Sequence, residues 1–551
     1  MSLWTRSDAS FPLIAATMVI LPVVIYFPVL LLGVPGQHPD QDHHFRLIST
    51  YEESLRRFDL TPALSYEGNN GFGSYDVRVY PPLFHIAAAT WLIVTESWQV
   101  GLFATFALLG MLGMVGVFLF SREMGSSPSG SLFAAISFGI TPYLVNHAYN
   151  SFFYGEIAAI SVMPWCFLFA YRLCRAGKLP DIAGLSISFA ALILSNLPQL
   201  VIVSICLAIF VLFYLEKPTM IRQVGAVAGS LILALILSSF YLVRVVVESP
   251  WFKISMPNTD PSYDPRNNFA LGFLTSPYSV DSGWFAAILL GLALGSVSIG
   301  LIASGRIKEV VGSRSGRSLI VLLMIAAILM VPISEPVWSF GPLEKIQFPW
   351  RFLSVAAICG CVLLARCFDG AASGSAMSRR PRLIVFAGLI LVVATFSLKQ
   401  LILAADYNSS EQLNARLARI DGSIGLEHWQ PVWTEPTLFV NSTEAPIVQR
   451  TADPSRSMIE TGPDTPTDLM LPVAYYPYWT SNLNTSLSVG NKGAMTLNNV
   501  PRDSRVELTF AEPPINEFAG YLSLITFLAL LGTFLVMLVR SVGSYTFKWT
   551  K

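Results

Sequence analysis

Charged residues are scarce in this 551-residue chain: they make up 13% of it, whereas an ordinary soluble domain carries about 25%. The two signs are balanced, with 35 Lys and Arg against 35 Asp and Glu, so no excess of positive charge indicates a nucleic acid as partner. The shortage of charge excludes an ordinary soluble protein, and a hydrophobic content of 53% indicates a membrane protein.

Cysteine is also rare, and its placement argues against a disulfide framework. All six cysteines lie in or beside apolar runs: Cys166, Cys174, Cys206, Cys359, Cys361 and Cys367. The polar segment 401–517, which we expect outside the membrane, has none. No disulfide-stabilised outer domain is therefore expected.

Long apolar runs recur along the chain, and most approach the roughly 20 residues that a helix needs to cross the hydrocarbon core. They lie at about residues 11–33, 100–120, 129–145, 157–173, 182–214, 222–243, 283–304, 318–333, 351–368, 383–400 and 518–539. The run at 182–214 is long enough for two crossings, with Asn196, Pro198 and Gln199 as the break. The pattern predicts an all-α polytopic protein with about twelve transmembrane helices.

Lys and Arg in the short loops predict the orientation, because positively charged loops stay in the cytoplasm. By alternation, the outside receives loops 34–81, 146–156, 244–282 and 334–350 and the segment 401–517. Residues 82–95 do not fit this count. We expect a short or re-entrant helix there, or a full crossing that merges two runs elsewhere.

The chain is predicted to divide into a membrane body, residues 1–400, an outer β-rich domain, residues 401–517, and a final helix with a cytoplasmic tail, residues 518–551. The outer segment begins with a polar helical stretch and ends with alternating runs (TSLSVG, AMTLNNV, RVELTF) typical of a small antiparallel sheet. Its aromatic cluster at 475–479 fits either a sugar-stacking platform or the core or rim of that sheet.

The first outer loop gathers rare residue types. Within seven positions the chain has His38, Asp40, Asp42, His43 and His44, although it has only six histidines in all. Such crowding indicates a functional site, and the alternative is a solvated polar loop. The following residues, from Phe45 to Phe58, have apolar side chains near helical spacing and predict an amphipathic interfacial helix.

An Asp-rich loop after the first helix, an interfacial helix, a Gly71-Phe72-Gly73 stretch and Tyr80-Pro81-Pro82-Leu83 resemble the opening of GT-C glycosyltransferases. Later motifs continue the resemblance in order: Thr141-Pro142-Tyr143, Tyr149, Glu156 and Pro164, then Gln347-Phe348-Pro349-Trp350-Arg351-Phe352, then Tyr475-Tyr476-Pro477-Tyr478-Trp479. Within that class, the order is most similar to the bacterial membrane proteins labelled 6-pyruvoyl-tetrahydropterin-synthase-related.

The resemblance implies a polyprenyl-phosphate-sugar-dependent glycosyltransferase in a bacterial cell membrane, with its active site outside. Its partners would be a polyprenyl-phosphate-linked sugar, membrane lipid and a glycan, lipid or protein acceptor. Nothing resembles a soluble pterin synthase, which would need a compact zinc-binding fold rather than a dozen membrane helices. The family leaves the sugar and the acceptor open.

Glycosyl transfer needs a base for the acceptor proton and positive charge or hydrogen-bond donors for the departing phosphate. Asp40 or Asp42 fits the base, and the sequence leaves open which one. Glu156 is a third catalytic candidate, and its alternative is a helix N-terminal charge favoured by the helix dipole.

Six residues are candidates for substrate binding: His43, His44, Tyr80, Tyr149, Trp350 and Arg351. Arg351 fits a phosphate clamp because a guanidinium binds phosphate bidentately, and its alternative is an interfacial anchor with Trp350.

A divalent metal ion is a further candidate cofactor, since two carboxylates and several imidazoles lie close together, although Asp-x-Asp-His-His is not a closed-site spacing. The competing function is a transporter or flippase of a lipid-linked or polar substrate, which would also use broken helices and acidic residues near membrane depth. A membrane scaffold is the third reading.

Overall fold

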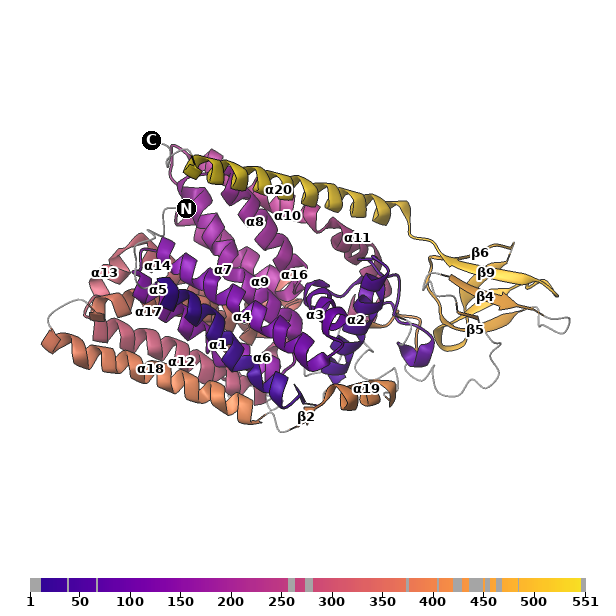
Figure 1. Ribbon diagram of the computed structural model, residues 1–551, viewed down its shortest axis with the longest axis horizontal. Helices are drawn as coiled ribbons and strands as arrows, with labels where there is room; N and C mark the ends of the chain where they lie inside the picture. Colours follow the sequence, from indigo (N-terminus) through magenta and orange to yellow (C-terminus); the bar gives the residue numbers. More distant parts are fainter. Residues whose placement is uncertain are drawn as a thin grey trace. The chain divides into compact units, whose positions relative to one another are not determined.

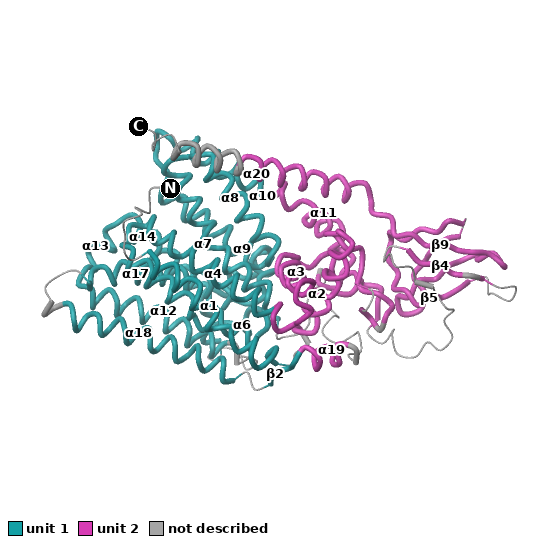
Figure 2. Tube along the Cα trace, viewed as in Figure 1, with its two compact units in different colours: residues 1–36, 102–234, 258–409 teal, residues 37–101, 235–257, 410–551 magenta. Residues whose placement is uncertain are grey.

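The computed structural model describes residues 11–36, 39–65, 68–255, 263–272, 281–372, 376–403, 406–419, 429–435, 449–450, 456–461, 468–483 and 485–546. The chain forms two compact units, each assembled from separated stretches of sequence (Figure 2). The first unit comprises residues 1–36, 102–234 and 258–409, and the second comprises residues 37–101, 235–257 and 410–551. Contacts therefore do not follow the predicted linear division at residues 400 and 517.

The first unit is a helical bundle (Figure 1). Its longer helices are α1 (Phe11–Leu31), α4 (Trp98–Glu123), α5 (Pro128–Gly139), α6 (Pro142–Tyr149), α7 (Tyr154–Arg175), α8 (Leu179–Ile193), α9 (Leu197–Leu212), α10 (Met220–Leu237), α12 (Asp281–Ser304), α14 (Arg314–Leu329), α17 (Leu353–Ala372) and α18 (Ala376–Leu403). The first residues of α4 and the last of α10 belong to the second unit. Short helices α13 (Ile307–Gly312), α15 (Glu335–Trp338) and α16 (Gly341–Glu344) connect them.

Nine helical segments in the described part of the chain are long and apolar enough to cross a membrane, or ten if the bent pair Arg314–Leu329 and Pro332–Trp338 is one span. The expected count of about twelve also included two crossings in 182–214. These became α8 and α9, which are apolar but only 15 and 16 residues long. The predicted fold class, a polytopic helical membrane protein with a small strand-rich region, is confirmed.

A short strand pair joins the beginning and the end of the first unit. Strand β1 (Val34–Pro35) pairs antiparallel with β2 (Tyr407–Asn408), and the side-chain amide of Asn408 donates to the carbonyl of Gly36 at 3.0 Å. Gly33 permits this approach, since its φ is +120° and an added Cβ would lie 2.4 Å from the carbonyl oxygen of Asn408. Both ends of the bundle are thus fastened at one place.

In the second unit, α2 (Pro39–Arg56) packs against α3 (Leu83–Thr95). The helix α2 begins at Pro39, six residues before the expected start at Phe45, so the Asp- and His-rich stretch is the first part of a helix rather than a loop. Asp42, His43 and His44 are buried there, which contradicts the solvated-loop alternative. Residues 83–95 form one short apolar helix, as one of the two expectations had it.

The strand-rich part of the second unit holds two antiparallel sheets. One sheet has the order β3 (Gln449–Arg450), β4 (Arg456–Glu460), β9 (Arg505–Phe510) and β6 (Trp479–Ser481), and the other has β5 (Leu469–Ala474), β8 (Ala494–Asn498) and β7 (Ser486–Val489). The three alternating runs therefore form strands, and the predicted polar helix is α19 (Ser410–Arg419).

The aromatic motif of this domain belongs to its core. Tyr476 and Trp479 are buried in one apolar cluster with Tyr75 and Phe510, and the Tyr75 and Tyr476 rings stack with centroids 4.1 Å apart. Of the alternatives for this motif, the core of the sheet is confirmed for these two rings.

The connection from the strands into the last helix also lies in the second unit. Helix α20 (Pro514–Thr546) packs on α11 (Ser239–Glu248), and the hydroxyl of Ser239 accepts or donates a hydrogen bond with Ser523 at 2.9 Å. The helix begins at Pro514, four residues before the expected boundary at 518, and the proline takes the first helical position.

Candidate functional site

A buried ion pair lies where three candidate membrane spans of the first unit begin or end. Glu156 is in the first turn of α7 and is fully buried. Its Oε1 accepts hydrogen bonds from the Tyr143 hydroxyl at 2.5 Å and the Gln199 amide at 2.8 Å, and its Oε2 accepts from Arg351 Nε at 3.1 Å. A carboxylate can remain charged in such a place only with partners of this kind.

The guanidinium of Arg351 is held in place by only part of its donor set. Nε binds Glu156, and Nη1 donates to the carbonyl oxygen of Ile346 at 2.6 Å. Aromatic rings of Phe153, Phe348 and Trp350 lie 4.8 to 5.8 Å from its central carbon. In the described part of the chain, Nη2 has no hydrogen-bond partner, so this nitrogen of the guanidinium can donate to a further acceptor.

Two further polar side chains lie beside this pair. The indole Nε1 of Trp350 and both ring nitrogens of His147 are buried without a hydrogen-bond partner among the described residues. The His147 Nε2 lies 3.5 Å from Glu156 Oε1, and the His147 and Trp350 rings lie 6.2 Å apart. Leaving buried donors unpaired costs about 1–3 kcal/mol each, so such groups call for an explanation.

We call this group, Tyr143, His147, Glu156, Gln199, Trp350 and Arg351, the arginine cluster. The cluster has more hydrogen-bond donors than acceptors, because its single carboxylate already accepts from Tyr143, Gln199 and Arg351. A site with spare N–H donors, one of them on a cation, fits an anionic oxygen ligand such as a phosphate.

Local sequence explains how the arginine cluster is assembled. Gly155 has no side chain, and an added Cβ would lie 2.6 Å from the carbonyl oxygen of Ser195, so α7 and the turn before α9 can touch only with glycine here. Asn196 caps α9 by accepting from the backbone N–H of Gln199. The break that looked like a helix interruption thus directs Gln199 at Glu156.

Two residues that flank the cluster have left-handed backbones. Phe152 has φ 55° and Gln347 has φ 67°, immediately before the segments that carry Glu156 and Arg351. A non-glycine residue in this region costs about 1 kcal/mol or more, and such strain tends to accumulate at functional sites.

Tyr149 lies apart from this set. Its hydroxyl donates to the backbone carbonyl of Ile25 at 2.8 Å, and its ring stacks on Tyr26 with the planes 5° apart. Its only donor is therefore spent on packing α6 against α1, so its predicted part in substrate binding finds no support in these contacts.

The other predicted residues meet in the second unit, around α2. His43 stacks on Trp429 with centroids 6.0 Å apart and meets the edge of Tyr80 at 5.0 Å. Its Nδ1 lies 3.3 Å from Asp76 Oδ2. Burial lowers the pKa of His43 despite the opposing charge of Asp76, so its imidazole is neutral at pH 7.

His44 is paired with a histidine that the sequence reading did not single out. His85, in the first turn of α3, has Nδ1 3.1 Å from the Pro81 carbonyl oxygen, which makes that nitrogen the donor. Its Nε2 therefore accepts from His44 Nδ1 at 2.9 Å. The sequence feature that could have pointed to His85 is Tyr80-Pro81-Pro82, because this segment directly precedes α3 and directs the first turn of α3 toward α2.

The two aspartates of α2 have different surroundings. Asp40 is partly exposed, whereas Asp42 is buried and its Oδ1 lies 2.5 Å from Arg416 Nη2 of α19. Two residues apart on a helix, they point about 200° from each other, so they do not act on one ligand together. In the described residues, no three His, Cys, Asp or Glu side chains are placed to hold a metal ion.

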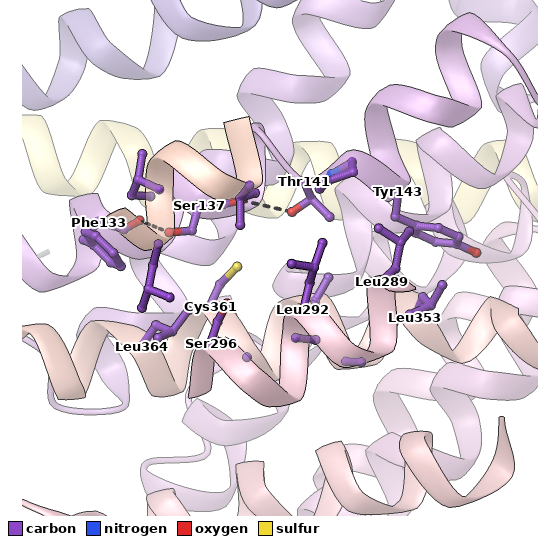
Figure 3. Close-up of a pocket in the computed structure, with 18 residues that line it drawn as sticks. Phe133, Ser137, Thr141, Tyr143, Leu289, Leu292, Ser296, Leu353, Cys361 and Leu364 are labelled. Carbon is purple, nitrogen blue, oxygen red and sulfur yellow. Dashed lines mark hydrogen bonds between the residues drawn. The ribbon is translucent and has the colours of Figure 1, made fainter. Parts of the chain in front are cut away.

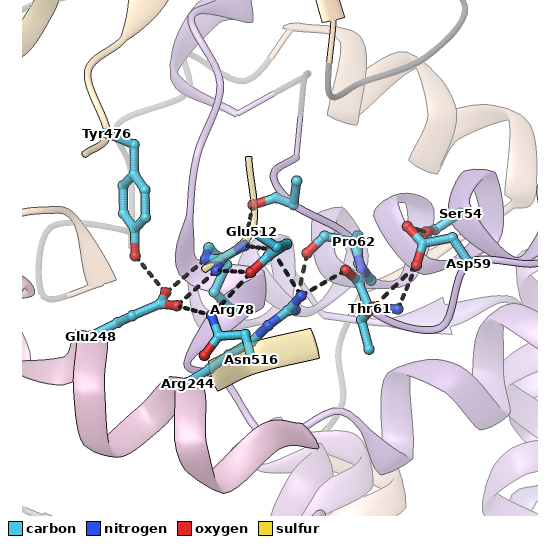
Figure 4. Close-up of polar contacts among 11 residues, drawn as sticks. Ser54, Asp59, Thr61, Pro62, Arg78, Arg244, Glu248, Tyr476, Glu512 and Asn516 are labelled. Carbon is cyan, nitrogen blue, oxygen red and sulfur yellow. Dashed lines mark hydrogen bonds and ion pairs between the residues drawn. The ribbon is translucent and has the colours of Figure 1, made fainter. Parts of the chain in front are cut away.

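A second buried charge network, which no sequence motif had indicated, lies in the second unit (Figure 4). Arg78 Nε and Nη2 donate to Glu248 at 2.6 and 2.7 Å, and Nη1 and Nη2 donate to Glu512 at 2.5 and 3.0 Å. Glu248 also accepts from the Tyr476 hydroxyl, and Glu512 from Arg244.

We call Arg78, Arg244, Glu248, Glu512, Tyr476 and Asn516 the carboxylate staple. Burial would raise the pKa of Glu512, but the hydrogen bond and charge of Arg78 and the charge of Arg244 outweigh it and lower the pKa to about 2. Two arginines and two glutamates balance in charge, and Arg78 has spent its donors, so the staple is a structural feature rather than a ligand site.

A match to a known protein family shows the family to which the chain belongs. Residues 77–403, more than half of its length, match the model of the 6-pyruvoyl-tetrahydropterin synthase related domain, described as a membrane protein. The chain belongs to this family. The predicted family is thus confirmed, and the matched part includes Tyr80, Tyr149, Glu156, Trp350 and Arg351 but begins after Asp40 and Asp42.

The chain is also similar to several solved structures. It is similar to the apo oligosaccharyltransferase of Archaeoglobus fulgidus, with 14% identity and a TM-score of 0.47 over 80% of this chain and 62% of that one. It is similar to the arabinofuranosyltransferase AftD from Mycobacteria, with 15% identity and a TM-score of 0.48 over 72% of this chain and 27% of that one.

A third similar structure is ArnT from Cupriavidus metallidurans bound to undecaprenyl phosphate, with 13% identity and a TM-score of 0.43 over 92% of this chain and 100% of that one. All three are GT-C glycosyltransferases, the class that the motif order resembles. The chain spans less than two thirds of the first two proteins, and with TM-scores below 0.5 these likenesses carry no argument. No curated protein matches the chain significantly.

Proposed function

We propose that this protein is a membrane glycosyltransferase that moves a sugar from a polyprenyl-phosphate donor to an acceptor on the extracytoplasmic face. The observation that carries the proposal is a pair of N–H groups in the arginine cluster that have no hydrogen-bond partner among the described residues, Arg351 Nη2 and the buried Trp350 Nε1, with the His147 ring beside them. In this proposal they bind the phosphate of the donor and stabilise the charge that it gains as the sugar leaves.

The position of the cluster along the helices supports a lipid phosphate. Glu156 begins one candidate span, Trp350 and Arg351 begin another, and His147 lies near the end of a third. Ends of membrane spans lie at the level of the lipid head groups, where a polyprenyl phosphate carries its charge.

The reaction also needs a base, and the carboxylates of α2 are the candidates. The acceptor oxygen or nitrogen forms a bond to the anomeric carbon of the sugar, the bond from that carbon to the phosphate oxygen breaks, and the phosphate keeps the electron pair. The base takes the acceptor proton. His43 and His44, buried beside Tyr80, would hold the acceptor or orient the carboxylate.

Glu156 has the role of a positioning residue in this scheme. Its carboxylate accepts from Tyr143, Gln199 and Arg351 Nε, so it holds the Arg351 guanidinium through Nε and leaves Nη2 to other acceptors. Catalysis by Glu156 itself, as first expected, would require it to exchange one of these partners.

The Arg351→Lys variant tests the phosphate clamp. Lysine keeps the charge but loses the planar fork, so we expect the affinity for a polyprenyl-phosphate sugar to fall by about tenfold or more. Donor binding to the purified protein in nanodiscs measures it. The control is Arg366→Lys on α17, the helix that follows Arg351, where Nη1 donates to the hydroxyls of Ser313 and Ser315 instead.

Equal donor affinity in wild type and Arg351→Lys would reject the clamp. Turnover with a panel of polyprenyl-phosphate sugars tests the function as a whole. Movement of a lipid-linked sugar across proteoliposomes without any transfer would favour the transporter alternative.

A further inference from the structure

Two apolar side chains are exposed where α2 ends, in the second unit. Phe58 is 96% exposed and Leu60 is 56% exposed. In the first unit apolar surface is expected, because its helices are candidate membrane spans; α5, α12, α17 and α18, which line an apolar pocket, are examples (Figure 3). Phe58 and Leu60 lie outside every candidate span in the described part of the chain.

A single exposed apolar residue is common, but the backbone of Phe58 is strained as well. The helix α2 ends in a Schellman turn, in which the N–H of Asp59 donates to the Ser54 carbonyl at 3.0 Å and the N–H of Phe58 to the Leu55 carbonyl at 2.9 Å. Phe58 therefore has the left-handed position of this turn, with φ 59°, where glycine is preferred. Its Cβ makes this conformation unfavourable, and so exposed a ring gains little from packing within the chain.

The turn holds Phe58 in a defined direction. The carboxylate of Asp59 accepts from the Ser54 hydroxyl at 3.0 Å and from the backbone N–H of Thr61 at 2.8 Å. These bonds fix the backbone on both sides of Phe58. The ring is thus presented to its surroundings by an ordered turn, and strain of this kind tends to accumulate where a protein binds something.

The same turn is bonded to the start of a candidate membrane span of the second unit (Figure 4). Arg244 Nη2 donates to the Thr61 carbonyl at 3.1 Å and to Glu512 at 2.9 Å, and Glu512 lies two residues before Pro514, where the span begins. Phe58 is three residues from Thr61, a reach of about 11 Å at most. The polar layer on each side of the hydrocarbon core is about 5–8 Å thick, so Phe58 and Leu60 are within reach of lipid.

Charge at this turn also fits a lipid surface. Arg57 is exposed and, among the described residues, forms no ion pair with an acidic side chain. A guanidinium binds phosphate with charge-assisted hydrogen bonds, and arginine and aromatic side chains together are typical of the boundary between membrane and water.

We propose that Arg57, Phe58 and Leu60 form a membrane contact. The two apolar side chains insert into the leaflet at the Pro514 end of α20, and Arg57 binds lipid phosphates there. The rest of α2 does not take part, since Phe45 and Ile48 of its apolar face are buried in the protein. The contact goes beyond the proposed function, because it requires neither a sugar donor nor catalysis.

The test uses full-length protein in nanodiscs, with and without doxyl-labelled phosphatidylcholine. All six native cysteines are buried, so Leu60→Cys can be labelled selectively with an NBD maleimide. We expect the doxyl lipid to quench most of the emission of this label. Val489→Cys is the matched control: Val489 is also apolar and exposed, but it lies on β7, the edge strand of a sheet that does not include β9, the strand that leads into α20.

Phe58→Gly, made in the labelled Leu60→Cys protein, separates the side chain from the turn. Glycine adopts the left-handed conformation without strain, so the variant should unfold at the same temperature or a higher one. Without the ring, the ratio of lipid-embedded to water-exposed label should fall about tenfold. Glu96→Gly is the matched control, because Glu96 has the same left-handed position at the end of α3, with φ 51°, and no apolar side chain.

Three results would overturn the proposal. The first is equal quenching at residues 60 and 489, and the second is an unchanged label in Phe58→Gly. The third is an unquenched label at residue 60 that forms disulfide crosslinks between two copies of the chain, which would make the turn a contact between proteins. Since no sugar transfer is measured, none of these results bears on the proposed function.

Discussion

Asp40→Asn is expected to lower the rate of sugar transfer by about two orders of magnitude or more, the usual scale for losing a general base. The structure separates it from its neighbour: Asp40 is partly exposed in the first turn of α2, whereas Asp42 is held by Arg416. Asp42→Asn should instead remove the negative charge that pairs with Arg416 and lower stability more than turnover.

Single-turnover assays with a confirmed donor measure the first effect, and thermal unfolding in the same detergent measures the second. Glu53→Gln is the matched control, because Glu53 is an exposed carboxylate on the same helix and its loss should change neither value. Normal turnover in Asp40→Asn, Asp42→Asn and the double variant would show that α2 carries no base, and the enzyme assignment would fall with it.

Arg78→Met is expected to destabilise the second unit by about 3–5 kcal/mol, the scale for breaking a buried ion pair. Arg78 is fully buried and serves two carboxylates at once, and its guanidinium lies 5.0 to 5.4 Å from the rings of Tyr476, Tyr478 and Phe510. Methionine replaces the packing but leaves Glu248 and Glu512 short of donors. The readout is resistance of the strand-rich part to protease in the full-length protein.

A triple variant distinguishes charge from packing. Arg78→Met combined with Glu248→Gln and Glu512→Gln removes the unpaired charges and should recover part of the lost stability. Arg56→Met is the control, since Arg56 is exposed and among the described residues pairs only with Glu52, and it should change stability by about 0.5 kcal/mol or less. Protease resistance of Arg78→Met equal to that of this control would contradict a structural role for the staple.

Much of the membrane body could be predicted because each span is a local property. The length and hydropathy of a run such as 100–120 are evident from that run alone, and α4 (Trp98–Glu123) covers nearly the same residues. The outer strands were also local, since TSLSVG, AMTLNNV and RVELTF each alternate with period two. The start of α2 was missed because Asp40 to His44 are poor interior residues for an amphipathic pattern, and the burial of residues 41–44 comes from partners elsewhere in the chain.

The sites were predictable only in part, for the same physical reason. Glu156 and Arg351 were singled out separately, but their pairing spans 195 residues and has no local signature. Gln199 was seen as a helix break, although its side chain matters more than the break itself. Arg78, Glu248 and Glu512 lie in three different segments, and each reads alone as an ordinary polar position.

The short β1–β2 pair has a consequence for how the protein is made. Val34 and Asn408 are 374 residues apart, so a ribosome adding about 5–20 residues per second needs roughly 20–75 s between synthesising them. Throughout that interval, the residues after α1 have no strand partner, and every later helix up to α18 is inserted while this end of the bundle is open. The β1–β2 pair can therefore form only after all the helices between its two strands have been synthesised. Truncations before residue 407 should leave α1 far more accessible to the translocon and to membrane proteases.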